Sequence, residues 1–157
     1  MIELRNFIDL DKTEKQMVLN WRNSERVRAS MYNSQKIYLQ DHLNFIEELM
    51  YDKYKKYFLV KNRNVNIGVV YLDNIKNDEA IMGIYSNPEL RGQGTLLLNA
   101  LLDYSFMSLN LQRIKLEVYA DNCRARSLYG KYGFIENGVK FVNRKEVICM
   151  ELENENW

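Results

Sequence analysis

A loop with two glycines stands between a strand-like and a helix-like segment of the chain and could bind an anion. It reads Arg91-Gly92-Gln93-Gly94-Thr95 and follows the only proline, Pro88. Glycines allow backbone N–H groups to approach a ligand, and the start of the next helix adds about half a positive charge. This chemistry suits a pyrophosphate, although a tight turn without a ligand explains the same residues. The GxxxxGK[ST] pattern of a P-loop is missing, and Leu97 stands where a dinucleotide fingerprint requires its third glycine.

Two side chains could accept a proton. Glu117 lies in the alternating segment Leu116-Glu117-Val118, so it faces the opposite side from its apolar neighbours. If that side meets a cleft, the carboxylate can orient an amine and accept its proton; otherwise it is solvated or paired with Arg113 or Lys115. His42, the only histidine, is the rival base because its ordinary pKa is closer to neutral. A histidine beside an apolar stripe can equally be a packed or an exposed residue.

The composition limits the classes of function. The 157 residues include 22 basic and 21 acidic ones, giving a net charge of +1 and no basic stripe of the kind that binds nucleic acid. Two cysteines, Cys123 and Cys149, imply no disulfide framework, and with one histidine they argue against a zinc site. Apolar stretches fall short of the roughly 20 residues of a membrane span, and the first residues are not a signal peptide. We therefore expect one cytoplasmic domain over residues 1–157, with no metal, nucleic-acid or membrane partner.

Hydrophobic periodicity predicts the strands and helices that position these residues. A capping box at Thr13–Gln16 opens a first helix, and Gly133 closes a last one that starts at Asn122. Another helix is predicted from the glycine loop to Phe106. An apolar stripe marks one more, at Leu39, Leu43, Ile46 and Met50. Strands are predicted at 2–7, 57–60, 65–72, 80–85, 113–120, 134–139 and 146–152, an order that indicates an α/β domain with a mixed sheet.

Two motifs together resemble those of the GCN5-related N-acetyltransferases (GNAT superfamily). The residues from Arg91 to Gly94 match the first four positions of the acetyl-CoA loop [QR]-x-x-G-x-[GA], while Leu96 departs from its sixth. Residues Asn122 to Phe134 match N-x-x-A-x-x-L-Y-x-x-x-G-F at every fixed position. The resemblance implies acetyl-CoA as cosubstrate. It also implies an α/β (α+β) fold, with a central, mixed, mostly antiparallel twisted sheet of about seven strands and about four flanking helices.

The same resemblance implies roles for single residues. Tyr129 would stand near the sulfur of coenzyme A and protonate the leaving thiolate, since a phenol pKa of about 10 is near the thiol's of about 8.5. The strands at 80–85 and 113–120 would begin parallel and then splay, so that backbone groups of Ile84 and Tyr85 bind the pantetheine. Cofactor contacts are expected at Ile84, Tyr85, Arg91, Gly92, Gln93, Gly94, Thr95, Asn122 and Arg126.

Over most of its length the chain resembles a narrower group, the UDP-4-amino-4,6-dideoxy-sugar N-acetyltransferases of pseudaminic acid synthesis. The segments that carry this likeness are Trp21-Arg22-Asn23, Met31-Tyr32, His42-Leu43-x-Phe45-Ile46, Lys56 to Val60, Ile67-Gly68-Val69 and Gly83-Ile84-Tyr85. Arg22 could clamp a nucleotide phosphate. His42 and Phe45, three residues apart on one helix, share a face that could line a cleft. The expected substrate-binding residues are Arg22, Met31, Tyr32, His42, Phe45 and Tyr85.

We expect direct transfer of the acetyl group to the sugar's 4-amino group without an acyl-enzyme, with Glu117 as base and Tyr129 as acid. A backbone N–H of the strand that ends at Tyr85 would polarise the thioester carbonyl. The alternatives are a GNAT enzyme acting on a protein N-terminus or a polyamine, and a non-catalytic acetyl-CoA-binding module. A polyamine site should be rich in acidic residues, whereas Arg22 and the segment Arg26-Val27-Arg28 favour a nucleotide. The oligomeric state stays open, with a homodimer as the assembly considered.

Overall fold

The fold is built on one seven-stranded sheet with helices on both faces. The computed structural model describes all residues, 1–157, and its strands follow the order β1-β2-β3-β4-β5-β7-β6. Only β4 and β5 are parallel neighbours, and every other neighbouring pair is antiparallel. The strands are β1 (Ile2–Asn6), β2 (Lys56–Asn62), β3 (Val65–Lys76), β4 (Glu79–Ser86), β5 (Arg113–Tyr119), β6 (Ile135–Val142) and β7 (Lys145–Glu153). The helices are α1 (Lys12–Arg22), α2 (Glu25–Arg28), α3 (Leu39–Leu49), α4 (Gly94–Asp103) and α5 (Cys123–Lys131). This mixed, mostly antiparallel sheet confirms the predicted fold class.

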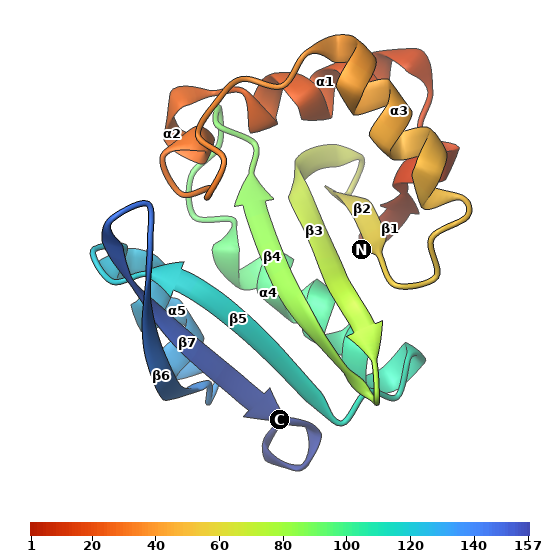
Figure 1. Cartoon of the computed structure of the whole chain (residues 1–157). Helices are drawn as coiled ribbons and strands as arrows, with labels where there is room; N and C mark the ends of the chain where they lie inside the picture. The colour runs from red at the N-terminus through yellow and green to blue at the C-terminus, as the bar shows by residue number, and fades with distance from the viewer.

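Two hydrophobic cores lie on opposite faces of the sheet. The larger contains 22 buried residues and packs α4, through residues such as Leu97, against Val70 of β3. The smaller contains 10 buried residues and joins Trp21 of α1 to Val69 and Tyr85 of the sheet. Adjacent residues such as Val69 and Val70 serve different cores because side chains alternate across a strand. Figure 1 shows α1 to α3 together at one end of the molecule, beside the first residues of β3 and the last residues of β4.

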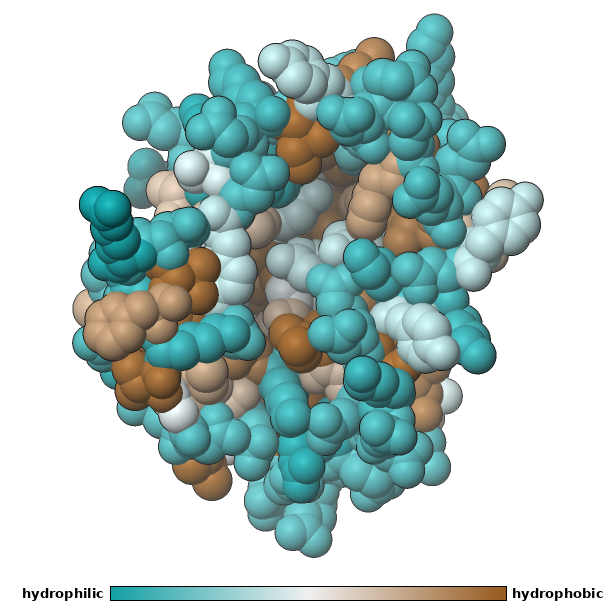
Figure 2. All heavy atoms as spheres, viewed as in Figure 1, coloured by the Kyte–Doolittle hydropathy of each residue, from teal (hydrophilic) through white to brown (hydrophobic).

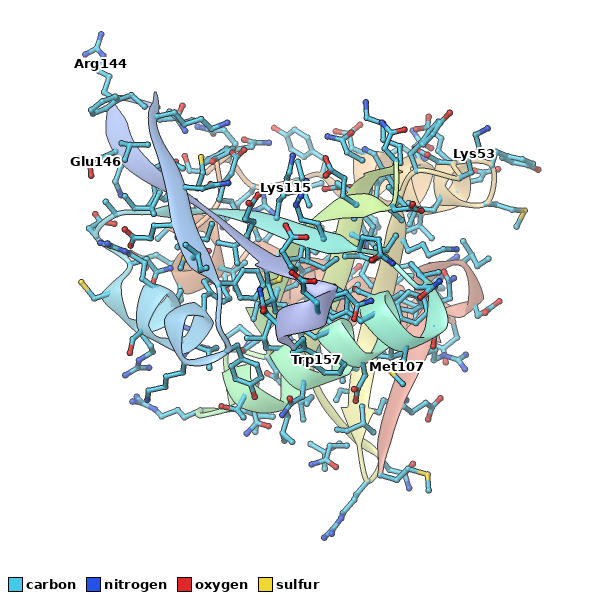
Figure 3. The ribbon with its side chains drawn as sticks, turned by 90° about the horizontal axis from the view of Figure 1, so that it is seen from below. Lys53, Met107, Lys115, Arg144, Glu146 and Trp157 are labelled. Atoms are coloured by element: carbon cyan, nitrogen blue, oxygen red, sulfur yellow. The ribbon has the colours of Figure 1, made fainter.

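The C-terminal end of the chain packs beneath the helix that follows the glycine loop. After α4 the chain continues as a π-helical turn, η2 (Tyr104–Ser108), and the rings of Phe106 and Trp157 lie 5.5 Å apart. Figure 3 shows Trp157 beside the helical segment that carries Met107. None of the helices combines the length and the apolar character that a membrane span needs.

The start of α1 differs from the sequence prediction. A capping box is present, but it is formed by Asp11 and Glu14 instead of beginning at Thr13. Asp11 Oδ1 accepts the N–H of Glu14 at 2.8 Å, and Glu14 Oε1 accepts the N–H of Asp11 at 3.0 Å. Aspartate and threonine both cap helices, so the local sequence allowed either start.

The buried face of α3 also differs from the predicted stripe. Its buried residues are His42, Ile46 and Leu49, whereas Leu39 and Met50 are exposed. The predicted apolar stripe and the observed buried face share only Ile46. The packing of α3 against α1 turns the helix so that His42 is buried instead. The short helix α2 was not predicted, and Ser24 caps it by accepting the N–H of Val27.

Candidate active site

β4 and β5 form a wedge because they pair only at one end. Their paired residues are Glu79 with Arg113, Ala80 with Ile114 and Ile81 with Lys115. Beyond Ile81, the part of β4 that carries Ile84 and Tyr85 has no strand partner toward β5, and Figure 1 shows the two strands diverging. The predicted splay is confirmed. It leaves backbone groups without sheet partners, which a ligand can satisfy.

The glycine loop leads directly into the first turn of α4, beside the wedge. Gly92 adopts φ +72°, and apart from its chain neighbours no residue has an atom within 4 Å of the position that a Cβ would take there. The side chain of Gln93 bonds to the carbonyl of Arg91 at 2.9 Å and does not cap the helix. The first-turn N–H groups of α4 therefore have no side-chain acceptor, as an anion-binding helix start requires.

The second motif packs against this loop. Asn122 Oδ1 accepts the N–H of Ala125 at 3.3 Å, so Asn122 caps α5 as predicted. Gly133, at φ +94°, follows the end of the helix. The Tyr132 hydroxyl donates to the carbonyl of Thr95 at 3.4 Å, and a Cβ on Gly94 would lie 3.0 Å from Leu128. The tertiary structure thus packs the first turn of α4 against the body of α5, and together they form one wall. Leu96, the departure from the loop pattern, packs against the larger core.

Tyr129 presents a free phenol to the interior of this region. Its side chain is 8% exposed, and its ring lies 5.8 Å from that of Phe134. The Tyr129 hydroxyl has no hydrogen-bond partner in the protein. It is nevertheless not sealed from solvent, because the only sealed side-chain atoms without a partner are Arg22 Nη1 and Asn66 Oδ1. The hydroxyl therefore keeps some contact with solvent-accessible space. Burial, and then the neighbouring Tyr71, raise the pKa of Tyr129, so the phenol is protonated at neutral pH.

Glu117 lies on the side of β5 opposite α4 and α5. Figure 3 shows Lys115 projecting to that side, and Glu117, two residues further along the strand, shares its face. The Tyr32 hydroxyl donates to Glu117 Oε1 at 2.5 Å, and Lys140 Nζ lies 2.9 Å from the same oxygen. Partial burial raises the pKa of Glu117, but these two contacts outweigh it and hold the pKa below its ordinary value. The group is therefore an ionised hydrogen-bond acceptor at neutral pH.

The segment between α2 and α3 reaches across to the β5–β7 side of the sheet. Asn143, in the turn between β6 and β7, donates to the carbonyl of Tyr32 at 2.8 Å and to the hydroxyl of Tyr119 at 3.1 Å. The rings of Tyr32 and Tyr119 meet edge to face, 5.7 Å apart. Figure 2 shows this face hollowed between the two sides, with pale residues of intermediate hydropathy at the floor. The contacts around Tyr32 thus join the segment between α2 and α3 to β5 and to the β6–β7 turn.

Arg22, Met31 and Phe45 lie with the smaller core, on one face of the sheet. Arg22 Nη2 donates to the carbonyl of Asn33 at 2.8 Å, and Nη1 has no partner. Phe45 packs edge-on against Tyr57, with ring centroids 4.9 Å apart. Met31 is half-buried against the smaller core, to which Tyr85 belongs. These predicted substrate-binding residues therefore lie on the side of the sheet that Glu117 faces.

Two predicted site residues have other partners. His42 lies in the α1–α3 interface, where its Nε2 is 2.9 Å from the carbonyl of Lys15, and burial lowers its pKa. The expectation that His42 lines a cleft together with Phe45 is therefore wrong. Arg126 donates to the carbonyl of Ala120 and to Glu136 Oε1, each at 2.8 Å, so its guanidinium stabilises the turn before α5 instead of standing free for a cofactor.

A separate cavity of about 980 Å³ lies behind α1, between that helix, the start of β3 and the segment Asn87–Leu90. None of the predicted site residues lines it.

Comparison with known proteins identifies the family. The model of the acetyltransferase (GNAT) family matches residues 16–134. The chain belongs to the GNAT family. The acetyltransferase PseH of Campylobacter jejuni subsp. jejuni (serotype O:23/36, strain 81-176) is 35% identical over 134 residues, which are 85% of each chain. These GNAT relatives confirm the predicted enzyme class, an acetyl-CoA-dependent N-acetyltransferase.

Solved GNAT structures agree with the fold. The Campylobacter jejuni N-acetyltransferase PseH in complex with acetyl coenzyme A matches with a TM-score of 0.82 at 29% identity, covering 98% of this chain and 99% of that one. The spermidine N-acetyltransferase of Vibrio cholerae in complex with CoA and spermine matches with a TM-score of 0.88 at 27% identity, covering 99% and 96%. The curated spermidine N(1)-acetyltransferase of Vibrio cholerae is 38% identical over 102 residues, 59% of each chain. The backbone of this GNAT protein is thus shared with PseH and with an enzyme named for spermidine.

Sequence reasoning missed several residues around the hollow. Lys140 and Asn143 come from β6 and its turn, far along the chain from Tyr32 and β5. Tyr71 lies on β3 in an ordinary strand pattern. No local motif marks any of these three, because their roles depend on which strands become neighbours.

Proposed function

We propose that the chain transfers the acetyl group of acetyl-CoA to the 4-amino group of a UDP-linked 4-amino-4,6-dideoxy sugar, as in pseudaminic acid synthesis. The likeness to PseH over 85% of both chains supports this choice among GNAT acceptors. The distribution of charge around the hollow supports it independently.

Unpaired positive charge beside the hollow is the observation that carries the proposal. Arg22 and Arg28 donate to the neighbouring carbonyls of Asn33 and Ser34, and neither forms an ion pair with a carboxylate. Burial lowers the pKa of the Arg22 guanidinium, while nearby tyrosines led by Tyr85 oppose that effect. A buried cation without a counter-ion is costly, so an anion is favoured here. Because Arg22 Nη1 is sealed from solvent, a bound anion would meet the other guanidinium nitrogens of Arg22 and Arg28. A nucleotide diphosphate supplies that charge and suits planar guanidinium groups.

Carboxylates near the hollow, by contrast, already have partners. Glu117 pairs with Lys140, and Glu79 pairs with Arg113 and Lys115 at 3.1 and 2.9 Å. Asp73 accepts from the Tyr57 hydroxyl at 3.3 Å. A polyamine carries several positive charges and needs free carboxylates, so these pairings disfavour it. The spermidine acetyltransferase relatives make a polyamine the second candidate, and the free arginines argue against it.

Residues around the wedge fit acetyl-CoA. The uncapped start of α4 and the open side of Gly92 offer N–H groups to a pyrophosphate. The unpaired edge of β4 at Ile84 and Tyr85 can hydrogen-bond the pantetheine as an added strand would. Asn122 contributes by capping and orienting α5. Bound there, acetyl-CoA supplies the activated acyl group.

Proton transfer is divided between two side chains on either side of the wedge. The attacking amine must be neutral, and an amine with a pKa near 8 is only partly neutral at pH 7. Glu117 is ionised, and both of its protein partners contact Oε1, so Oε2 stays available to accept the amine's proton directly or through a water. Tyr129, neutral and free, protonates the departing sulfur of coenzyme A. Neither Cys123, which is exposed, nor Cys149 is needed as a nucleophile.

An acceptor panel tests the proposal. The protein is given acetyl-CoA with UDP-4-amino-4,6-dideoxy-N-acetyl-altrosamine, an N-terminal peptide panel or spermidine, and both free-thiol release and product mass are measured. Acetylation of the nucleotide sugar with the highest kcat/KM supports the proposal. Preference for spermidine or a peptide contradicts it. Binding of acetyl-CoA without turnover on any amine would instead indicate a non-catalytic module.

A matched pair of variants tests the role of the free charge. Arg22→Met removes the unpaired guanidinium, and the loss of a charge-assisted bond should raise the KM for the nucleotide sugar about tenfold to hundredfold. The KM for acetyl-CoA should stay unchanged. Arg144→Met is the control, because Figure 3 shows Arg144 pointing away from the body at the tip of the β6–β7 hairpin. Equal effects of the two variants would contradict the assignment.

A further inference from the structure

Three residues in register form a row across β2, β3 and β4 on the face of the hollow. Tyr57 pairs with Tyr71, and Tyr71 pairs with Gly83. The rings of Tyr57 and Tyr71 are stacked, with centroids 4.6 Å apart and planes inclined by 3°. The stack therefore lies along the sheet, and its last member is next to β4.

The far end of the Tyr71 ring lies over Gly83. A Cβ on Gly83 would be 2.0 Å from Tyr71 Cζ and 2.2 Å from its hydroxyl oxygen, far inside contact distance. Gly83 adopts an ordinary strand conformation, so it is required here for space and not for backbone freedom. The missing side chain lets the phenol of Tyr71 extend over β4.

That position borders the wedge. Gly83 is two residues beyond Ile81, the last residue of β4 that pairs with β5. Ile84 and Tyr85, whose backbone is proposed to bind the pantetheine, follow directly. The Tyr71 hydroxyl is thus carried to the strand that separates the acceptor side from the cofactor side. Its influence on the pKa of both Tyr85 and Tyr129 agrees with a place between them.

The Tyr71 hydroxyl also forms no hydrogen bond within the protein. It has no hydrogen-bond partner, and it is not among the partnerless atoms sealed from solvent. The Tyr57 hydroxyl differs, because it donates to both oxygens of Asp73 at 3.3 Å. Burial, with a further contribution from Asp73, raises the pKa of Tyr71 to about 12, so the phenol is neutral at working pH. A neutral phenol donates to and accepts from hydroxyl or acetamido groups, but gives a polyammonium ion no counter-charge.

We propose that Tyr71 binds the acceptor, its hydroxyl hydrogen-bonding an oxygen of a polyhydroxylated or acetamido sugar beside the attacking amine, and that Gly83 provides the space for it. The inference rests on the proposed function, since it names how the acceptor's sugar ring is recognised. It makes Tyr71 and Gly83 a pair that determines acceptor specificity while leaving the acetyl-CoA contacts intact.

Tyr71→Phe is the direct test, because phenylalanine keeps the stacked ring and removes only the hydroxyl. Steady-state kinetics with the nucleotide sugar should show kcat/KM for the acceptor reduced about tenfold, as for one lost hydrogen bond. The KM for acetyl-CoA and the melting temperature should stay near wild type. Tyr57→Phe is the matched control: it removes the other hydroxyl of the stack, which is satisfied by Asp73, and should leave the acceptor KM unchanged.

Gly83→Ala tests the second half of the pair. The added methyl group must displace the phenol, so the variant should reproduce the loss in acceptor kcat/KM. Wild-type acceptor kinetics for Tyr71→Phe would overturn the inference, and so would equal losses toward acceptor and acetyl-CoA. Failure of the proposed function is distinguishable, because wild-type protein would then acetylate no nucleotide sugar. Tyr71→Phe would in that case be measured with whichever amine the wild type accepts, and an unchanged kcat/KM would again overturn the role.

Discussion

Replacing Tyr129 by phenylalanine should remove the general acid while leaving the fold unchanged. The ring packs in the larger core and lies 5.8 Å from Phe134, and both of these contacts are available to phenylalanine. Because the hydroxyl bonds to no protein group, its removal leaves no buried donor or acceptor unpaired. We therefore expect the free energy of unfolding to change by less than about 1 kcal/mol.

The expected effect on catalysis is much larger. General acid catalysis contributes on the order of 10²- to 10⁴-fold. A phenol whose pKa is raised by burial is a weak acid, but it is fully protonated and already in place next to the wedge. We expect kcat to fall about 10²- to 10³-fold, equivalent to about 2.7–4 kcal/mol in the activation free energy.

The assay should compare two acetyl donors. With acetyl-CoA, the leaving thiolate benefits from a proton, so Tyr129→Phe should show its full loss. With the acetyl thioester of an electron-poor aryl thiol, the thiolate leaves unprotonated at neutral pH, and the loss should shrink at least tenfold. Equal losses with both donors would refute the acid role and leave Tyr129 as a packing residue. A melting curve and the KM for acetyl-CoA serve as the controls for folding and binding.

Three other perturbations follow from the geometry. Lys140→Met removes one of the contacts that hold the pKa of Glu117 below its ordinary value, so that pKa should rise. Since the base must be ionised, the acid limb of the kcat/KM profile should move to higher pH, and an unmoved limb would argue against Glu117 as the base. Gly92→Ala places a side chain at φ +72° in open space, so backbone strain alone should cost about 1 kcal/mol. For a chain of this size that is a decrease of about 2–4 °C in melting temperature, measured by calorimetry, with acetyl-CoA binding expected to weaken as well. Asn143→Ala should release the segment around Tyr32, raising both its rate of limited proteolysis and the acceptor KM, whereas a resistant segment would show that other contacts hold it.

Local sequence already determined the proposed cofactor side of this protein. The glycine loop and α5 are each a single run of consecutive residues. Their conformations follow from short-range rules of capping, glycine geometry and helix polarity. Asn122 caps α5 and Gly133 follows its end, both as predicted. The positions of the strands along the chain also followed from periodicity, because alternation within a strand can be read without knowing which strands pair with it.

Only the tertiary structure decided the proposed acceptor side. Tyr32 meets Glu117 across 85 residues of chain, and Tyr71 lies over Gly83 only because β3 and β4 pair in one register. His42 was expected beside the acceptor, but the packing of α3 on α1 buries it against Lys15. Such contacts depend on which surfaces meet, and a strand or helix pattern specifies one face of an element without naming the partner that covers it. The motifs of the proposed cofactor site were therefore readable from the chain itself, whereas the residues proposed to surround the acceptor became visible only when distant strands were brought together.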